Sequence, residues 1–172
     1  MKFFPIVSSR RFLLVAVSLV ALTGLFGCRC ASDAVGGACE PTYPEGSVPV
    51  TVHASGSGDH QLMLEVARTN KERGRGLMFR DGLAQDGGML FVFDQEGDWP
   101  FYMRNTYIPL DIIHVDGRGN VCGWLEDMKP HDWTSRSPGC MARYVIEVVA
   151  GSVRAWGLRV GDRVDLPELS SD

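Results

Sequence analysis

The chain has 172 residues, of which 21 are acidic and 17 are basic. Residues 1–27 hold three of the basic residues and no acidic one, so the remainder has 14 basic against 21 acidic residues, a formal charge of −7. Such a surface repels phosphate backbones, and no basic cluster offsets the repulsion, so nucleic-acid binding is disfavoured. The roughly 145 residues after the first 27 suffice for one domain with its own core.

Residues 1–27 have the pattern of a bacterial lipoprotein export signal. An unbroken apolar run from Phe12 to Phe26 follows the basic residues, and its ~15 residues are fewer than the ~20 that a membrane-spanning helix needs. Leu25-Phe26-Gly27-Cys28 resembles a lipobox. Cys28 is therefore predicted to carry the lipid anchor, palmitate included, and to become the new N-terminus. A plain secretory signal and a permanent membrane anchor remain as alternatives.

The segment Ser9-Arg10-Arg11-Phe12-Leu13 also partly resembles a twin-arginine signal, so the general and twin-arginine export routes both stay open. Arg29, rather than an aspartate, follows the lipobox cysteine. We therefore expect a protein anchored to the cell envelope, and we favour the periplasmic side of the outer membrane over the inner membrane.

Four cysteines remain if Cys28 is lipidated: Cys30, Cys39, Cys122 and Cys140. An even number in an oxidising compartment suggests disulfides, and of the three possible pairings we favour Cys122–Cys140 with Cys30–Cys39. The first pair would close a loop of about 19 residues, worth roughly 3 kcal/mol on a chain-entropy estimate. Free buried thiols are the alternative. A zinc site is disfavoured because no pair has the short gap that zinc sites use.

Residues 28–47 lack periodicity and are predicted to be a flexible tether to a domain at 48–167, with 168–172 as a tail. Thr69-Asn70-Lys71-Glu72 is a capping box that begins a short helix. A second short helix is predicted at 152–157. Alternating apolar residues and turn signals predict strands at 48–52, 61–66, 88–93, 101–106, 110–115, 121–125, 143–149 and 163–166. Asp116-Gly117-Arg118-Gly119 predicts a hairpin turn that leads into the strand at 121–125.

This pattern predicts a mainly β fold. Around eight strands with regular turns and two short helices are typical of a single compact β-sandwich, jelly-roll-like, or of a partly closed barrel.

The central third of the domain also carries a dense run of motifs. They are Arg75-Gly76-Leu77-Met78-Phe79-Arg80, Gly88-Met89-Leu90-Phe91-Val92-Phe93, Phe101-Tyr102-Met103-Arg104-Asn105-Thr106 and Ile108-Pro109-Leu110-Asp111. In this order and spacing the chain resembles the family called domain of unknown function 192, from about Val48 to Leu166. Tyr102 stands where tryptophan is usual, and the cysteines at 122 and 140 are not general features of the family. The resemblance implies a compact, mainly β, jelly-roll-like fold and brings no established activity.

A polar group is predicted around the strand at 110–115. Alternation points Asp111 toward an apolar face, where an unpaired carboxylate would be very costly. Arg80 and Arg104, in the flanking motifs, are the candidate partners, and Asn105 or Thr106 could satisfy the remaining lone pairs of the carboxylate. This arrangement is either a buried ion pair that fixes strand register or a polar pocket for an anionic or hydroxylated ligand. General acid–base catalysis by Asp111 is a third reading.

Trp99 and Tyr102 could line a groove, although most aromatic residues here are expected in the core. The four histidines lack metal-binding spacing, and no nucleophile elbow, phosphate loop or dinucleotide fingerprint is present. No metal and no cofactor is therefore predicted.

We expect a monomeric, lipid-anchored binding module, without catalytic activity, for a small ligand, a glycan or an envelope protein. The first alternative is an envelope hydrolase that uses Asp111 with Arg80 or Arg104. The second is a purely structural envelope lipoprotein. Whether the protein is an enzyme is left open, and the sequence does not identify the ligand.

Overall fold

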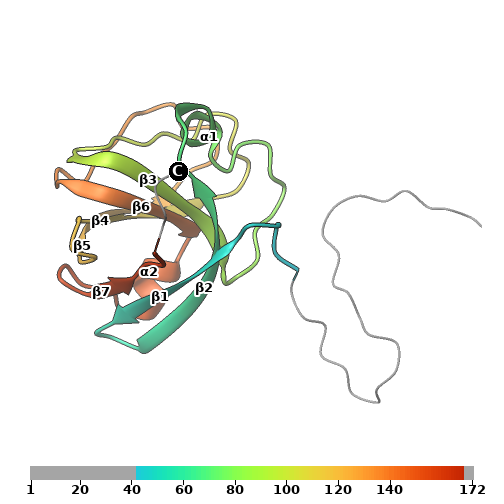
Figure 1. Ribbon diagram of the computed structural model, residues 1–172. Helices are drawn as coiled ribbons and strands as arrows, with labels where there is room; N and C mark the ends of the chain where they lie inside the picture. The colour runs from blue at the N-terminus through green and yellow to red at the C-terminus, as the bar shows by residue number, and fades with distance from the viewer. Residues whose placement is uncertain (1–41, 169–172) are drawn as a thin grey trace, which may run out of the picture.

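The computed structural model describes residues 42–168, so the export signal, Cys28 and the Cys30–Cys39 pair lie outside the described residues. One curled, seven-stranded sheet dominates the fold, with two short helices (Figure 1). The elements are β1 (Val48–Ala54), β2 (Gly58–Ala67), α1 (Asn70–Arg75), β3 (Gly87–Gly97), β4 (Leu110–Val115), β5 (Val121–Met128), β6 (Ala142–Val149), α2 (Ser152–Trp156) and β7 (Arg163–Asp165). The prediction of a mainly β, partly closed barrel-like fold is confirmed. Within 42–168 no helix is long and apolar enough to cross a membrane.

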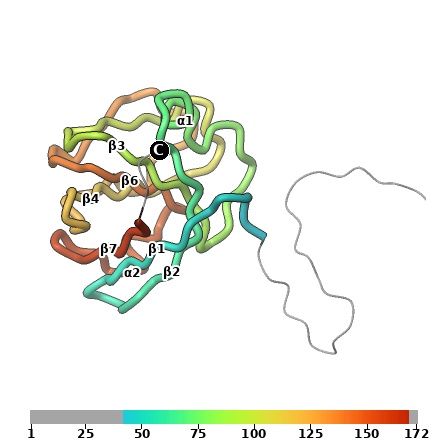
Figure 2. Tube along the Cα trace, viewed as in Figure 1, coloured from blue at the N-terminus to red at the C-terminus, as the bar shows by residue number. Residues whose placement is uncertain are grey.

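The strands are ordered β5-β4-β6-β3-β2-β1-β7 in the sheet. β2 and β3 are parallel, and every other neighbouring pair is antiparallel. The two edges meet at one end, because Asn120 forms a bridge with Arg163 and the Val164 N–H donates to the Gly119 carbonyl at 2.7 Å. Figure 2 follows the resulting curl of the chain. The sheet is therefore a half-barrel that closes at one corner.

Each face of the sheet has its own apolar core. The inner core fills the concave side and includes Val153 and Trp156 of α2, which lies beside β1 and β7 (Figure 1). The outer core lies on the convex side. It is covered by Leu77 after α1 and by the segment 98–109, which contributes Phe101 and Met103. All six residues of β4 are buried, because that strand is covered on both faces.

The short-range predictions are confirmed. Thr69 caps α1: its hydroxyl accepts from the Glu72 N–H at 3.2 Å, and the Glu72 carboxylate accepts from the Thr69 N–H at 2.8 Å. The predicted hairpin between β4 and β5 closes with a hydrogen bond from the Asp116 N–H to the Asn120 carbonyl at 2.9 Å.

One predicted strand is wrong. Residues 101–106 form no strand and make only an isolated bridge between Phe101 and Arg136. The segment crosses the outer core with Met103 buried and Arg104 exposed, which produces the alternation of a strand. Asn105 then turns the chain with φ of 53°. A covering loop with one side buried thus has the same local pattern as an edge strand.

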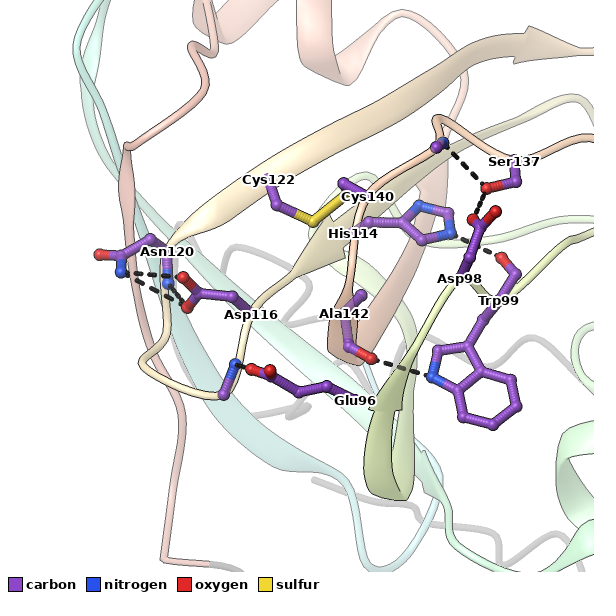
Figure 3. Close-up of a disulfide and its surroundings, with 12 residues drawn as sticks. Glu96, Asp98, Trp99, His114, Asp116, Asn120, Cys122, Ser137, Cys140 and Ala142 are labelled. Carbon is purple, nitrogen blue, oxygen red and sulfur yellow. Dashed lines mark hydrogen bonds between the residues drawn. A yellow bond between two sulfur atoms is a disulfide. The ribbon is translucent and has the colours of Figure 1, made fainter.

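The predicted disulfide between Cys122 and Cys140 is present, with their Cα atoms 6.0 Å apart (Figure 3). It joins β5 to the segment 129–141. Arg136, in that segment, exchanges two backbone hydrogen bonds with Phe101. The disulfide therefore also restrains the cover of the outer core.

Replacing both cysteines, in Cys122→Ser/Cys140→Ser, should lower the free energy of unfolding by roughly 3 kcal/mol, because the unfolded chain regains the entropy of an open loop. Urea denaturation of the parent and the double variant, each with and without reductant, measures this loss. Reductant should destabilise only the parent. Equal unfolding midpoints for the oxidised parent and the double variant would show that the disulfide is energetically silent.

Candidate functional site

Asp111 is fully buried on the inner face of β4, and backbone amides satisfy it. Its Oδ1 accepts from the Asp127 N–H at 2.8 Å, and its Oδ2 accepts from the Val153 N–H at 2.9 Å. Val153 is the second residue of α2, whose N-cap position is Gly151 and has no side chain to cap the helix. Asp111 therefore caps α2 from a distant strand, as a carboxylate at a helix N-terminus does.

The other amide bond holds an irregular part of β5. The register between β4 and β5 shifts between Leu110 and Ile112, and Asp127 has a φ of 50° there. The prediction that an arginine pairs with Asp111 is wrong. The reason is that two unpaired backbone N–H groups, at the helix start and at the strand irregularity, supply the donors that the carboxylate needs.

The three other residues of the predicted polar pocket lie elsewhere. Arg80 forms an ion pair with Glu65 (Nη2 to Oε2, 2.6 Å). The guanidinium of Arg104 lies 4.9 Å from the ring centroid of Trp133, and Asn105 contacts Met78 through its amide nitrogen. Within residues 42–168 no hydrogen bond or ion pair joins Asp111, Arg80, Arg104 and Asn105 to one another, so the structure does not assemble them into one site.

A cavity of about 240 Å³ opens instead on the convex side of the sheet, between the outer core, the turn after α1 and the segment 99–106. We call it the aromatic pocket. Its lining includes Phe91, Phe93, Trp99, Phe101, Tyr102 and Glu147. Trp99 and Tyr102, which the sequence suggested for a groove, are therefore both in the lining.

The walls of the aromatic pocket are held by ring contacts. Phe93 stacks on Trp99 with ring centroids 4.1 Å apart. The Arg73 guanidinium lies 5.1 Å from the ring centroid of Phe93. Trp99 donates its indole N–H to the Ala142 carbonyl at 2.9 Å. Phe91 and Phe101 meet edge to face with centroids 5.1 Å apart. These contacts fix the rings before any ligand arrives, which lowers the ordering cost of binding.

Glu147 of β6 lies in this lining and is only 6% exposed. Its Oε2 has no hydrogen-bond partner among the described residues. Burial raises the pKa of Glu147 to about 8, against the opposing effect of a backbone hydrogen bond from Leu77. The side chain is therefore mainly neutral at pH 7 and can both donate and accept a hydrogen bond.

The turn after α1 passes close to this carboxyl group at Gly76. A Cβ atom at position 76 would lie 3.6 Å from the Glu147 Oε2 and 3.3 Å from the Phe91 ring, and the φ of Gly76 is +48°. The distance to Oε2 is an ordinary van der Waals contact, so the positive φ is what favours glycine at this position.

His114 is buried on the same face of the sheet. Its Nε2 lies 2.9 Å from the Trp99 carbonyl oxygen (Figure 3). Its ring meets Phe101 edge to face. Burial lowers the pKa of His114, so the ring is neutral at pH 7. Among the described side chains, the Nδ1 of His114 and the Oε2 of Glu147 are the two buried polar atoms without a partner. Both belong to strands beneath the same covering segment.

Sequence reasoning missed Glu147 as a site residue, although a signal was present. Glu147 interrupts the otherwise apolar run Val145-Ile146-Glu147-Val148-Val149, and the argument applied to Asp111 holds equally for it. Residues 42–168 contain no group of three or more His, Cys, Asp or Glu side chains arranged to hold a metal ion. The polar side chains of the pocket lining are therefore those of Glu147, Arg73, Arg75, Tyr102 and Thr106, which lie beside the aromatic rings.

Asp111→Ala should lower the free energy of unfolding by about 3 kcal/mol, because two buried N–H groups lose their acceptor and α2 loses its cap. Asp111→Asn keeps one acceptor oxygen and should cost less. Chemical denaturation measures both losses. Asp94→Ala, at an exposed position of β3, is the control and should stay within about 0.5 kcal/mol of the parent. A parent-like midpoint for Asp111→Ala would contradict the capping role.

Glu147→Gln should become progressively more stable than the parent as the pH rises. Because the pKa of Glu147 is raised from 4.5 to about 8 on folding, the parent loses stability between these two values and loses no more above pH 8. The free energy of unfolding of Glu147→Gln should then exceed that of the parent by an additional amount on the order of 4 kcal/mol. Urea denaturation of both proteins from pH 5 to 9 measures it, and His114, common to both, cancels in the comparison. A difference that does not vary with pH would show that Glu147 ionises freely in the folded protein.

Comparisons with known proteins agree with this fold. A crystal structure of a protein of unknown function from Novosphingobium aromaticivorans DSM 12444 is 37% identical, with a TM-score of 0.67, over 70% of this chain and 85% of that chain. A crystal structure from Sinorhizobium meliloti 1021, named as a candidate transcription regulator, is 32% identical, with a TM-score of 0.65, over 68% of this chain and 91% of that chain. No curated protein matches. The model of domain of unknown function 192, described as "Uncharacterized ACR", matches residues 50–166, and the chain therefore belongs to this family.

Proposed function

We propose that the protein is a non-catalytic binding module that takes a small, largely apolar ligand in the aromatic pocket, with a polar group of the ligand bonded to Glu147. The observation that carries this proposal is the Glu147 Oε2, which is buried without a partner at a preformed cavity. An apolar side chain of similar size would avoid the cost of burying an unsatisfied carboxyl group. A ligand that bonds to the Glu147 carboxyl group would remove this cost, which explains why a glutamate is present at this position.

The size and lining of the pocket limit the ligand. Its volume of about 240 Å³ lies below the ~300–1,000 Å³ typical of pockets for drug-sized molecules. Five aromatic residues of the lining can accept the apolar face of a ring compound or a sugar. A single ring with one or two polar substituents, free or at the end of a glycan, suits this enclosure.

The protein's location in the cell is inferred from the sequence and from the disulfide. We infer a monomer that Cys28 anchors to the envelope, on the periplasmic side of the outer membrane. The apolar run and the lipobox pattern of the sequence support the anchor. The Cys122–Cys140 disulfide supports an oxidising compartment. The ligand would then be a small envelope molecule.

A hydrolase built on Asp111 with Arg80 or Arg104 has less support. Both carboxylate oxygens of Asp111 accept backbone hydrogen bonds, and Arg80 is paired with Glu65. Glu147 has a pKa suited to proton transfer near neutral pH. However, the lining of the aromatic pocket supplies neither a second carboxylate nor a cysteine, serine or histidine nucleophile. Binding is therefore the preferred function.

Glu147→Leu should raise the melting temperature and abolish ligand binding, because it fills the site with an apolar side chain and removes the only carboxyl group of the lining. A thermal-shift panel of sugars and small aromatic acids, amides and amines, followed by amide NMR of Gly76 and Leu77, tests this.

The matched control is Glu126→Leu, which changes a partly exposed glutamate that pairs with Arg154 outside the aromatic pocket. It should bind as the parent does. A panel without any binder, or binders that Glu147→Leu retains, would reject the proposed site.

A further inference from the structure

Two arginines in the lining of the aromatic pocket have no carboxylate partner. Arg73 and Arg75 belong to the last turn of α1 and line the cavity. Neither forms an ion pair within residues 42–168. Basic residues near a helix C-terminus interact favourably with the helix dipole, but this interaction leaves their charge available to a ligand.

The acceptors that surround Arg73 are neutral. Its guanidinium donates to the Val92 carbonyl at 2.7 Å, to the Asn70 side-chain oxygen at 2.5 Å and to the Arg68 carbonyl. Glu72, the acidic residue of α1, accepts backbone hydrogen bonds at the opposite end of the helix. The guanidinium of Arg73 is therefore held in place while its positive charge is not neutralised.

Arg75 is exposed. Its side chain makes no hydrogen bond, ion pair or ring contact within residues 42–168, so it can reach a ligand at the mouth of the cavity. A protein with an excess of acidic residues thus places two cationic groups without a counter-ion in the lining of the aromatic pocket. Positive potential at a cleft favours negatively charged ligands.

Glu147 supports the same charge preference. The titratable side chains of the lining are Arg73, Arg75, Tyr102 and Glu147, and His114 is the neutral ionisable group on the neighbouring strand. With Glu147 protonated, the lining has no negative charge to attract a cation. A protonated carboxyl group instead donates a hydrogen bond to an oxygen acceptor.

We propose that the ligand of the aromatic pocket is a small organic anion with a ring body, whose carboxylate or phosphate lies at Arg73 and Arg75 and whose inner oxygen accepts a hydrogen bond from Glu147. This inference rests on the proposed binding function and specifies its ligand class. A planar guanidinium suits a carboxylate or phosphate in two-point contact. The aromatic side chains of the same lining can accommodate the ring.

The test uses probes that share a ring and differ in charge. One set is 4-hydroxyphenylacetate, its neutral amide and tyramine. A second set is glucuronate, its amide and glucosamine. Each is titrated into the purified protein at pH 7, and affinity is read from the amide signals of Gly76 and Leu77. We expect the anion of at least one set to bind at least fivefold more tightly than its neutral and cationic counterparts.

Variants separate charge recognition from the pocket itself. Arg75→Gln changes an exposed side chain and should weaken the anion three- to tenfold while leaving the neutral amide unchanged. Arg118→Gln, an exposed arginine in the turn between β4 and β5, should bind as the parent does. Above pH 8 the anion should bind the parent progressively more weakly, because Glu147 becomes charged, whereas Glu147→Gln should bind with no such loss.

Two outcomes overturn the inference. If the amine binds most tightly, or if the three members of each set bind equally, the ligand is not an anion, while the proposed binding function stands. If no probe of either set perturbs Gly76 or Leu77, both the inference and the proposed pocket are rejected.

Discussion

The buried carboxylate of Asp111 is the contact on which the half-barrel most depends. It lies on β4, a strand buried on both faces, and bonds to the Val153 N–H of α2 and to the Asp127 N–H of β5. One side chain of β4 thus connects this strand to the irregular end of the edge strand β5 and to the start of α2. A carboxylate suits this place because both donors are backbone groups that have no other acceptor nearby.

Glu147 presents the opposite case on the other face of the sheet. Both carboxyl groups are buried, yet Asp111 is fully bonded, whereas Glu147 keeps an oxygen without a partner among the described residues and has a pKa raised by burial. Buried polar groups in folded proteins are nearly always satisfied, so an unsatisfied one calls for an explanation. The explanation that we propose is the cavity beside Glu147: the first carboxyl group stabilises the fold, and the second would bond to a ligand.

The cover of the outer core forms one wall of the cavity beside this carboxyl group. The segment 98–109 brings Trp99 and Phe101 over the sheet, and hydrogen bonds between Phe101 and Arg136 tie it to the segment that the disulfide anchors to β5. Within residues 42–168 four non-glycine residues have a positive φ, and three of them, Phe79, Asn105 and His131, lie in or beside this cover. Such backbone is costly and is concentrated where function constrains it. The wall of the pocket formed by this cover is thus restrained by the Cys122–Cys140 disulfide and by the stacking of Phe93 on Trp99.

By itself, the sequence determined the features that depend on neighbouring residues: the capping box at Thr69, the hairpin turn at Asp116, most strands, and the β class of the fold. Spacing and cysteine number also favoured the Cys122–Cys140 disulfide. Tertiary structure alone decided which buried groups meet. Buried and exposed side chains alternate along residues 101–106 as they do in a strand, but this segment is a loop that covers the outer core. Asp111 needed a partner, yet a helix start 42 residues away supplies it. The sequence shows that Glu147 lies within an apolar run and is therefore expected to be buried. Only the packed fold shows that one oxygen of its carboxyl group has no partner among the described residues. The partners of buried groups come from distant segments of the chain, and a local sequence pattern does not show which segments meet.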